Sequence, residues 1–133
     1  MSKKIINPWT WQDKFGFVQA NQISEIQKML FCAGQVSVDQ SGNFIHAGDM
    51  KGQINQIFDN LETILQQAEM RLQDITRITY YTTNVSRFVE AETAQVLLNR
   101  LEKGHCRPAT SLIGVASLFH PDCVIELEAT AVM

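Results

Sequence analysis

The chain has 133 residues, a length that predicts a single domain, residues 1–133, with a core of its own. Eleven Lys and Arg against 14 Asp and Glu give a net charge of −3, and no segment gathers basic residues into the stripe that a nucleic-acid partner requires. Hydrophobic residues make up 45% and charged residues 19%, a balance that excludes disorder.

No window reaches the run of roughly 18 apolar residues that a membrane span needs, and Met1–Pro8 breaks off before any signal-peptide core. We therefore expect a cytoplasmic protein without a membrane partner. Cys32, Cys106 and Cys123 are odd in number and widely separated, unlike the framework of a secreted disulfide protein. We expect reduced thiols.

Strand signals open the chain. Gly16–Ala20 and Met29–Ala33 are short, apolar and β-compatible. Asp39–Asn43 is a clear turn signal after Val36 and Val38. These features predict that a hairpin opens the fold.

A long amphipathic helix follows from Asp49 to about Glu69. Asp49 can accept a hydrogen bond from a first-turn N–H, and its charge suits the positive end of the helix dipole. The apolar residues recur in steps of three and four and describe one stripe: Met50, Ile54, Ile57, Phe58, Leu61, Ile64, Leu65 and Ala68. Ile75–Thr83, rich in Thr, Tyr and Ile, then predicts a strand, on which Tyr80 and Tyr81 face opposite sides.

A second helix is predicted with Ser86 as its cap and Gly104 as a left-handed terminator. Its apolar face is formed by Ala94, Leu97, Leu98 and Leu101. Two strands complete the chain, Ala109–Ala116 and Cys123–Val132, with Leu118–Asp122 as the turn between them.

The predicted order is ββαβαββ, an α+β fold with a mixed sheet. Two helices of this length cover only one face, so the other face meets solvent or another subunit. The last strand indicates the sides: Ile125, Leu127, Ala129 and Ala131 share one face, and Glu126, Glu128 and Thr130 share the other.

Glu126 and Glu128 lie about 7 Å apart along their strand, near enough to raise each other's pKa and to act as a general acid and base. The alternative is a solvated strand face, which is the more common setting for charged residues.

Cys106 lies between His105 and Arg107, and positive neighbours favour a nucleophilic thiolate. A small residue at the entry to a strand is the more common role for such a cysteine, and Cys32 and Cys123 fit core packing.

The sequence offers no signal for a metal or an organic cofactor. His46, His105 and His120 are far apart, and no CxxC, HxxxH or HExxH spacing occurs. The glycines form neither GxGxxG nor GxxxxGK[ST], so we expect no nucleotide cofactor. Trp9 and Trp11 either line a pocket or, as is more common, anchor the N-terminal tail on the sheet.

Several segments together resemble the RidA/YjgF family of reactive intermediate deaminases, earlier labelled translation inhibitors or endoribonucleases (L-PSP). The resemblance covers nearly the whole chain. It rests on Gly16–Ala20, Ala33-Gly34-Gln35, Gly48-Asp49-Met50 with Gln53, Asp59-Asn60-Leu61 with Ala68, Tyr80–Val85 with Phe88, Arg107-Pro108-Ala109-Thr110, and Val124–Ala129.

The resemblance implies a chorismate-mutase-like fold and a homotrimer whose sheets form a central barrel, with a small-molecule pocket at each subunit interface. It also implies cofactor-independent hydrolysis of enamines and imines such as 2-aminoacrylate to a 2-oxo acid and ammonia. In such enzymes an arginine holds the substrate carboxylate, and a glutamate on the last strand helps to activate water.

Residue by residue, Glu126 matches that glutamate, and Gly34 with Gln35 matches the loop beside the pocket. Thr110, two residues after Pro108, occupies the position of the carboxylate-binding arginine. Three other positions that are polar in the deaminases hold Phe17, Ala33 and Leu112, and Glu92 falls where an asparagine is usual. The resemblance is therefore to a branch that lacks the arginine.

Arg107 is an open candidate for the lost cation, although strand alternation directs it to the face opposite Thr110 unless Pro108 introduces a bulge. An intersubunit ion pair or a solvent contact is the alternative. Three functions follow: an imine or enamine hydrolase for a ligand other than standard 2-imino acids, a non-catalytic metabolite-binding or regulatory trimer, and a ribonuclease. The net charge disfavours the ribonuclease.

Overall fold

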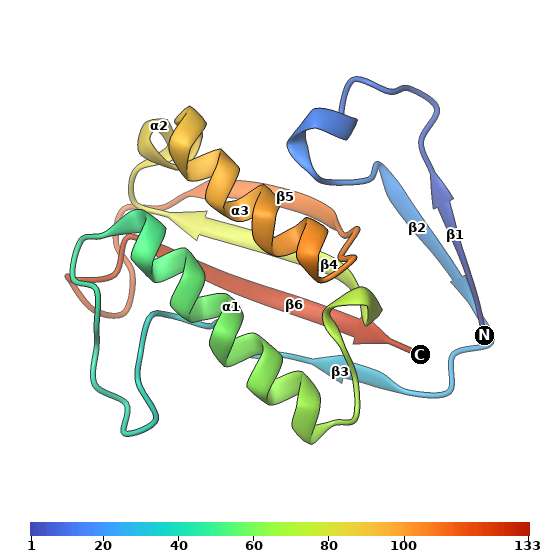
Figure 1. Ribbon diagram of the computed structural model, residues 1–133, viewed down its shortest axis with the longest axis horizontal. Helices are drawn as coiled ribbons and strands as arrows, with labels where there is room; N and C mark the ends of the chain where they lie inside the picture. The colour runs from blue at the N-terminus through green and yellow to red at the C-terminus, as the bar shows by residue number, and fades with distance from the viewer.

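A four-stranded mixed sheet forms the centre of the computed structural model, which describes residues 1–133 (Figure 1). Its strands, in spatial order, are β3 (Met29–Phe31), β6 (Ile125–Val132), β4 (Ile75–Thr82) and β5 (Ala109–Gly114). β4 and β5 run parallel, whereas β6 pairs antiparallel with both β3 and β4. The predicted mixed sheet is confirmed.

Two long helices, α1 (Met50–Gln67) and α3 (Ala91–Lys103), lie side by side on one face of this sheet (Figure 1). A short helix, α2 (Val85–Phe88), precedes α3, and two 3-10 turns, η1 (Asp13–Phe15) and η2 (Leu72–Asp74), precede β2 and β4. The other face carries no helix, as predicted. None of the helices combines the length and apolar character that a bilayer crossing needs.

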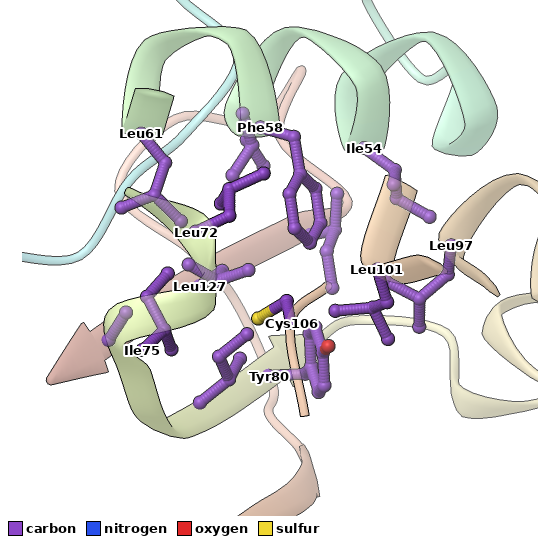
Figure 2. Packing of buried hydrophobic residues seen from close by; sticks show 14 of the residues in the cluster. Ile54, Phe58, Leu61, Leu72, Ile75, Tyr80, Leu97, Leu101, Cys106 and Leu127 are labelled. Carbon is purple, nitrogen blue, oxygen red and sulfur yellow. The ribbon is translucent and has the colours of Figure 1, made fainter. Parts of the chain in front are cut away.

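The core lies between the helices and the sheet. Figure 2 shows Ile54, Phe58 and Leu61 of α1 packed towards the side chains of β4 and β6. Each such side chain stabilises the fold by roughly 1.5–3 kcal/mol when fully buried. The predicted stripe of α1 is confirmed, because its central members are all buried: Met50, Ile54, Ile57, Phe58, Leu61 and Leu65.

α1 begins where the sequence predicts. The Asp49 side chain accepts a hydrogen bond from the Gly52 N–H at 3.1 Å, which satisfies one of the unpaired donors of the first turn. The turn signal before it is also confirmed. Val38 pairs with Phe44, and Asp39 accepts backbone bonds from Ser41 and Asn43.

The N-terminal strands differ from the prediction. β1 (Ser2–Ile6) and β2 (Ala20–Ser24) form a separate two-stranded antiparallel sheet beside the main one (Figure 1). Gly16–Ala20, predicted as the first strand, enters β2 only at its last residue. Gly16 has a φ of +75° and ends η1, and only Val18 bridges to Ala109 of β5. From β2 onward the predicted order holds, with α2 added.

The predicted start of the second helix was wrong, whereas its predicted end is confirmed, because α3 ends at Lys103 with Gly104 as its C-cap. Ser86 lies inside α2, which Asn84 caps by accepting from the Arg87 N–H, and α3 begins after Glu90. Gly104 has a φ of −87° and is not left-handed. A Cβ at Gly104 would lie 2.6 Å from Leu72 Cδ1, so close packing of η2 requires this glycine.

Candidate functional site

An apolar pocket of about 250 Å³ lies between the N-terminal segment, α3 and the helix side of β4 and β5. Thr110 pairs with Ile78 in the sheet register and so lies on the helix-covered face. The predicted site residues Phe17 and Thr110 meet here, together with Leu112. Ten of the 13 residues that line the pocket are hydrophobic, among them Phe15, Phe88, Val89, Ala94, Leu97, Leu98 and Leu101.

Two hydroxyl groups belong to the walls of this pocket, those of Thr110 and Tyr80. The Tyr80 hydroxyl is buried without a hydrogen-bond partner, an arrangement that costs about 1–3 kcal/mol. Figure 2 shows the Tyr80 ring on the α3 side of β4, near Leu101. Burial raises the pKa of Tyr80 far above its usual range, so the group stays a neutral donor.

The helix-free face carries the second group of predicted residues. Glu126 of β6 pairs with Tyr81 of β4, and Glu128 pairs with Thr79. The Tyr81 hydroxyl donates a 2.6 Å hydrogen bond to Glu128 Oε1. Burial, and then the neighbouring charge of Glu128, raise the pKa of Glu126 above its ordinary value. A carboxylate with a raised pKa is a stronger base than a solvated one.

The loop after β3 lies against Glu126. Gln35 exchanges two backbone hydrogen bonds with Leu127, at 2.7 and 3.0 Å, which places residues 33–35 beside β6. A Cβ added at Gly34 would lie 2.7 Å from Glu126 Oε2. The absence of a side chain at residue 34 therefore allows the carboxylate its position. Ala33 and Gly34 are both exposed at this edge.

Gln53 of α1 fixes the segment that leads into β6. Its buried side chain donates to the carbonyl oxygens of His46 and Asp122, at 2.9 and 2.7 Å, and accepts from the Val124 N–H at 2.9 Å. Two of these three bonds hold the chain just before Glu126, and the third links it to the turn before α1. These bonds fix the position of the backbone at the start of β6, the strand that carries Glu126.

Within one chain the two groups of predicted residues are separated. Thr110 and Phe17 belong to the pocket on the helix side of the sheet, whereas Glu126 with Gly34 and Gln35 lies on the opposite face. A single chain therefore does not bring the predicted water-activating glutamate to the pocket beside Thr110.

Arg107 and Pro108 precede β5. Arg107 is exposed and lines a neighbouring, more polar hollow with Asp13, Glu102 and His105, which shares its walls at Gly16, Phe17 and Leu101 with the apolar pocket. It makes no ion pair within the chain, and Pro108, which is buried, accepts a 3.0 Å bond from the Val18 N–H. Arg107 does not line the pocket that holds Thr110.

Glu92 stands in the first turn of α3 and forms a 3.1 Å ion pair with Lys51. Its side chain is 85% exposed, and it lines neither hollow beside Phe17. The structure thus places Glu92 on the outer surface of the helix layer, away from the other predicted residues of the same chain.

The thiols follow the structural alternatives, whereas the two tryptophans are largely exposed instead of packed on the sheet. Cys106 is part of the buried core (Figure 2), and burial raises its pKa to about 12, so no reactive thiolate forms at neutral pH. All three cysteines are free. No group of three His, Cys, Asp or Glu side chains is arranged to hold a metal.

Trp9 and Trp11 are more than half exposed, and Trp11 packs edge-on to Phe17 with ring centroids 6.0 Å apart.

The model of the family Endoribonuclease L-PSP matches residues 15–133. The chain belongs to this family. It is 32% identical over 111 residues to the RutC family protein PH0854 of Pyrococcus horikoshii, with 84% of each chain covered. The two matches together establish that this chain belongs to the RidA/YjgF family.

Two solved structures extend the relationship. YyfB of Yersinia pestis, a Rid-family protein of unknown function, superposes with a TM-score of 0.88 at 31% identity and full coverage of both chains. E. coli TdcF with bound serine gives a TM-score of 0.71 at 27% identity, over 88% and 87% of the two chains. The YjgF-type, chorismate-mutase-like fold is thereby confirmed for this family member.

Sequence reasoning identified Phe17 and Thr110 but missed most of the pocket wall. Ala94, Leu97, Leu98 and Leu101 were assigned to a helix face without a ligand. The missed signal lies at Gly16, because a Cβ there would be 2.5 Å from Leu98 Cδ2. The contact that brings the N-terminal segment onto α3 thus depends on a glycine whose partner is remote in sequence.

Proposed function

We propose that this family member is a cytoplasmic homotrimer that binds a small metabolite between subunits and hydrolyses its imine or enamine group. Glu126 directs the attacking water, and the pocket beside Thr110 receives the ligand. No organic cofactor or metal takes part. Products are a carbonyl compound and ammonia.

The position of Glu126 is the observation that carries this proposal. The carboxylate has a raised pKa, is fixed beside Gly34, and faces away from the helix layer. Such a group suits general base catalysis, but the pocket of its own chain lies on the other face. A neighbouring subunit that brings its pocket to this carboxylate would complete the site.

Exposed apolar side chains on the helix-free side support an assembly. Phe31 of β3 is 74% exposed and Ile113 of β5 is 42% exposed. Phe31 pairs with Thr130 and Ile113 with Tyr81, so both flank the polar row that contains Glu126. Large apolar side chains exposed on a sheet face that no helix covers favour a contact with another subunit.

The hydrolysis needs one base and one proton donor. Glu126 accepts a proton from water as the oxygen attacks the C=N carbon, and the electron pair of the C=N bond moves to nitrogen, which is protonated. The amino nitrogen of the resulting carbinolamine then gains a proton and its hydroxyl group loses one, so that the C–N bond breaks, ammonia leaves and the carbonyl group forms. An enamine enters the same route after protonation at carbon.

The ligand differs from a standard 2-imino acid. A carboxylate next to Thr110 would lack the bidentate cation that a guanidinium supplies, and Arg107 lines a different hollow. The serine bound to TdcF supports a small-molecule role for the same fold, since it shows that one similar protein accommodates a metabolite of this size.

A non-catalytic metabolite-binding or regulatory trimer is the second candidate. The observation in its favour is the wall of the pocket, where Phe17 and Leu112 leave few polar groups to orient a reacting atom. Ligand-dependent thermal stabilisation without product formation would identify this function.

The first test measures ammonia release from 2-iminopropionate and 2-iminobutyrate, generated in situ by an amino acid oxidase. Wild type is compared with Thr110→Arg and Glu126→Gln, and light scattering gives the mass of each assembly. Loss of wild-type turnover in Glu126→Gln supports hydrolysis. Activity gained only in Thr110→Arg supports an intact scaffold for another ligand. Full turnover in Glu126→Gln, or a stable monomer, contradicts the proposal.

A further inference from the structure

Aromatic side chains line the pocket beside Thr110, and Trp11, which is not itself a lining residue, packs against one of them. Phe17 is stacked with Phe15 at 6.4 Å between ring centroids, and Trp11 meets Phe17 edge-on. On the inner side Phe88 lies 5.3 Å from Tyr80. Phe15 and Trp11 remain 53% and 55% exposed. Exposed rings beside a concave apolar wall provide surfaces on which a flat ligand group can stack.

The size of the pocket limits its occupant. Its volume of about 250 Å³ is below the range of roughly 300–1,000 Å³ that holds drug-sized ligands. Leu98 and Leu101 of α3 form one wall, and Leu112 of β5 forms part of the opposite one. A single ring with a short substituent fits this space better than a fused or extended ligand.

The charges of the lining residues are equally restrictive. Lys14 is the only charged residue among the 13, it is exposed, and its Nζ lies 5.1 Å from the centroid of the Phe15 ring. The ammonium group therefore lies at the rim of the pocket, in a cation–π contact with Phe15. Deeper in the pocket Thr110 supplies the accessible hydroxyl, because the hydroxyl of Tyr80 is itself buried in the wall. A buried carboxylate would lose its hydration without gaining a cation.

We infer that the ligand of this site is a neutral compound with a single aromatic ring, whose ring lies between Phe17 and α3 and whose one small polar group meets the Thr110 hydroxyl. The inference rests on the proposed function, because it names the substrate class of the same pocket. The reactive form is then an aldimine that carries an aromatic ring and no carboxylate, which water converts to the aldehyde and ammonia.

A matched pair of stable probes tests the binding. Phenylacetamide and phenylacetate share a ring and differ in charge, and calorimetry gives their affinities. We expect phenylacetamide to bind wild type at least about tenfold more tightly than phenylacetate. In Thr110→Arg the order reverses, because a guanidinium pairs with the carboxylate. Tighter binding of phenylacetate to wild type, lost in Lys14→Gln, would overturn the inference and assign the pocket to aromatic acids.

A filled pocket provides the structural control. Ala94→Phe places a ring inside the pocket and should abolish phenylacetamide binding. Ala91→Phe adds the same ring to an exposed position of α3 outside the pocket and should leave binding unchanged. Thermal melting shows whether each variant is folded. If both folded variants bind as wild type does, the ligand lies elsewhere and the inference is wrong.

A matched pair of imines tests the chemistry. A flavin-dependent amine oxidase generates the aldimine of 2-phenylethylamine, and an amino acid oxidase generates the 2-imino acid of phenylalanine. We expect faster ammonia release from the first. Binding of phenylacetamide without turnover of either imine would uphold the ligand class and refute hydrolysis. Turnover of 2-iminopropionate without phenylacetamide binding would uphold hydrolysis and refute the ligand class.

Discussion

Glu126 and Gly34 are in such close contact that no side chain fits between them: a Cβ at residue 34 would lie 2.7 Å from Oε2 and 2.8 Å from Cδ of the glutamate. The two residues belong to segments that are 92 positions apart in sequence and are joined by the bonds between Gln35 and Leu127. The position of the carboxylate thus depends on a backbone without a side chain.

Gly34→Ala should therefore displace the Glu126 carboxylate. We expect ammonia release from any imine that wild type hydrolyses to fall by about 100-fold, the order of effect of losing a general base, with little change in melting temperature. Gly114→Ala is a suitable control, since its Cβ meets only a methyl of Val85 at 3.0 Å. Equal activity in the two variants would contradict this role of Gly34.

Glu128→Gln should lower the pKa of Glu126. The charge of Glu128 raises that pKa, so its removal favours the ionised form, while burial keeps the pKa above the ordinary value. Titration by carbon-13 NMR measures the change directly, and the acidic limb of a pH–rate profile should move to lower pH. Glu102→Gln removes one negative charge from α3, on the other side of the sheet, and should not alter the titration of Glu126. An unchanged pKa in Glu128→Gln would refute the coupling.

Cys106 should resist alkylation in the folded protein. Its pKa of about 12 leaves about one thiolate in ten thousand at pH 8, and its side chain belongs to the core. Iodoacetamide followed by mass spectrometry should modify the half-buried Cys32 first, and Cys106 only after denaturation. Rapid modification of Cys106 under native conditions would show that this part of the core opens.

Gly104→Ala should destabilise the fold. The new methyl group would overlap the Leu72 side chain, whose Cδ1 and Cβ lie 2.6 and 2.8 Å from the Cβ position. Overpacking of this kind costs about 1–3 kcal/mol, and urea denaturation measures it. Glu102→Ala, an exposed change two residues away, should alter stability by less than about 0.5 kcal/mol. A more stable Gly104→Ala protein would show that η2 moves aside.

The sequence predicted the elements whose local pattern agrees with their burial. α1 has an unbroken apolar stripe and its own capping residue, Asp49. β6 alternates strictly between buried Ile125 and Leu127 and the outward Glu126 and Glu128. In both elements the residues that determine the structure lie within about 20 positions of one another, so a local sequence pattern is enough to predict it.

Features that depend on remote partners were not predicted. β2 has the polar sequence Ala-Asn-Gln-Ile-Ser and is a strand because β1 lies beside it. Gly104 ends α3, as its place in the sequence indicated, but the Leu72 side chain that leaves no room for a Cβ at Gly104 belongs to η2 and could not be predicted. Alternation fixes the face of Thr110 relative to Leu112 within β5, but its face relative to Glu126 follows from the register with β4, which is a tertiary property.

The place of β6 in the sheet has a consequence for biosynthesis. This strand follows every other element along the chain, yet it lies between β3 and β4. While the ribosome is still translating it, α1 and α3 have no completed sheet to cover, and their apolar faces remain open to water. Non-local pairing of this kind slows folding and prolongs exposure of aggregation-prone surface. A nascent chain that pauses before β6 is thus a natural client for chaperones and proteases.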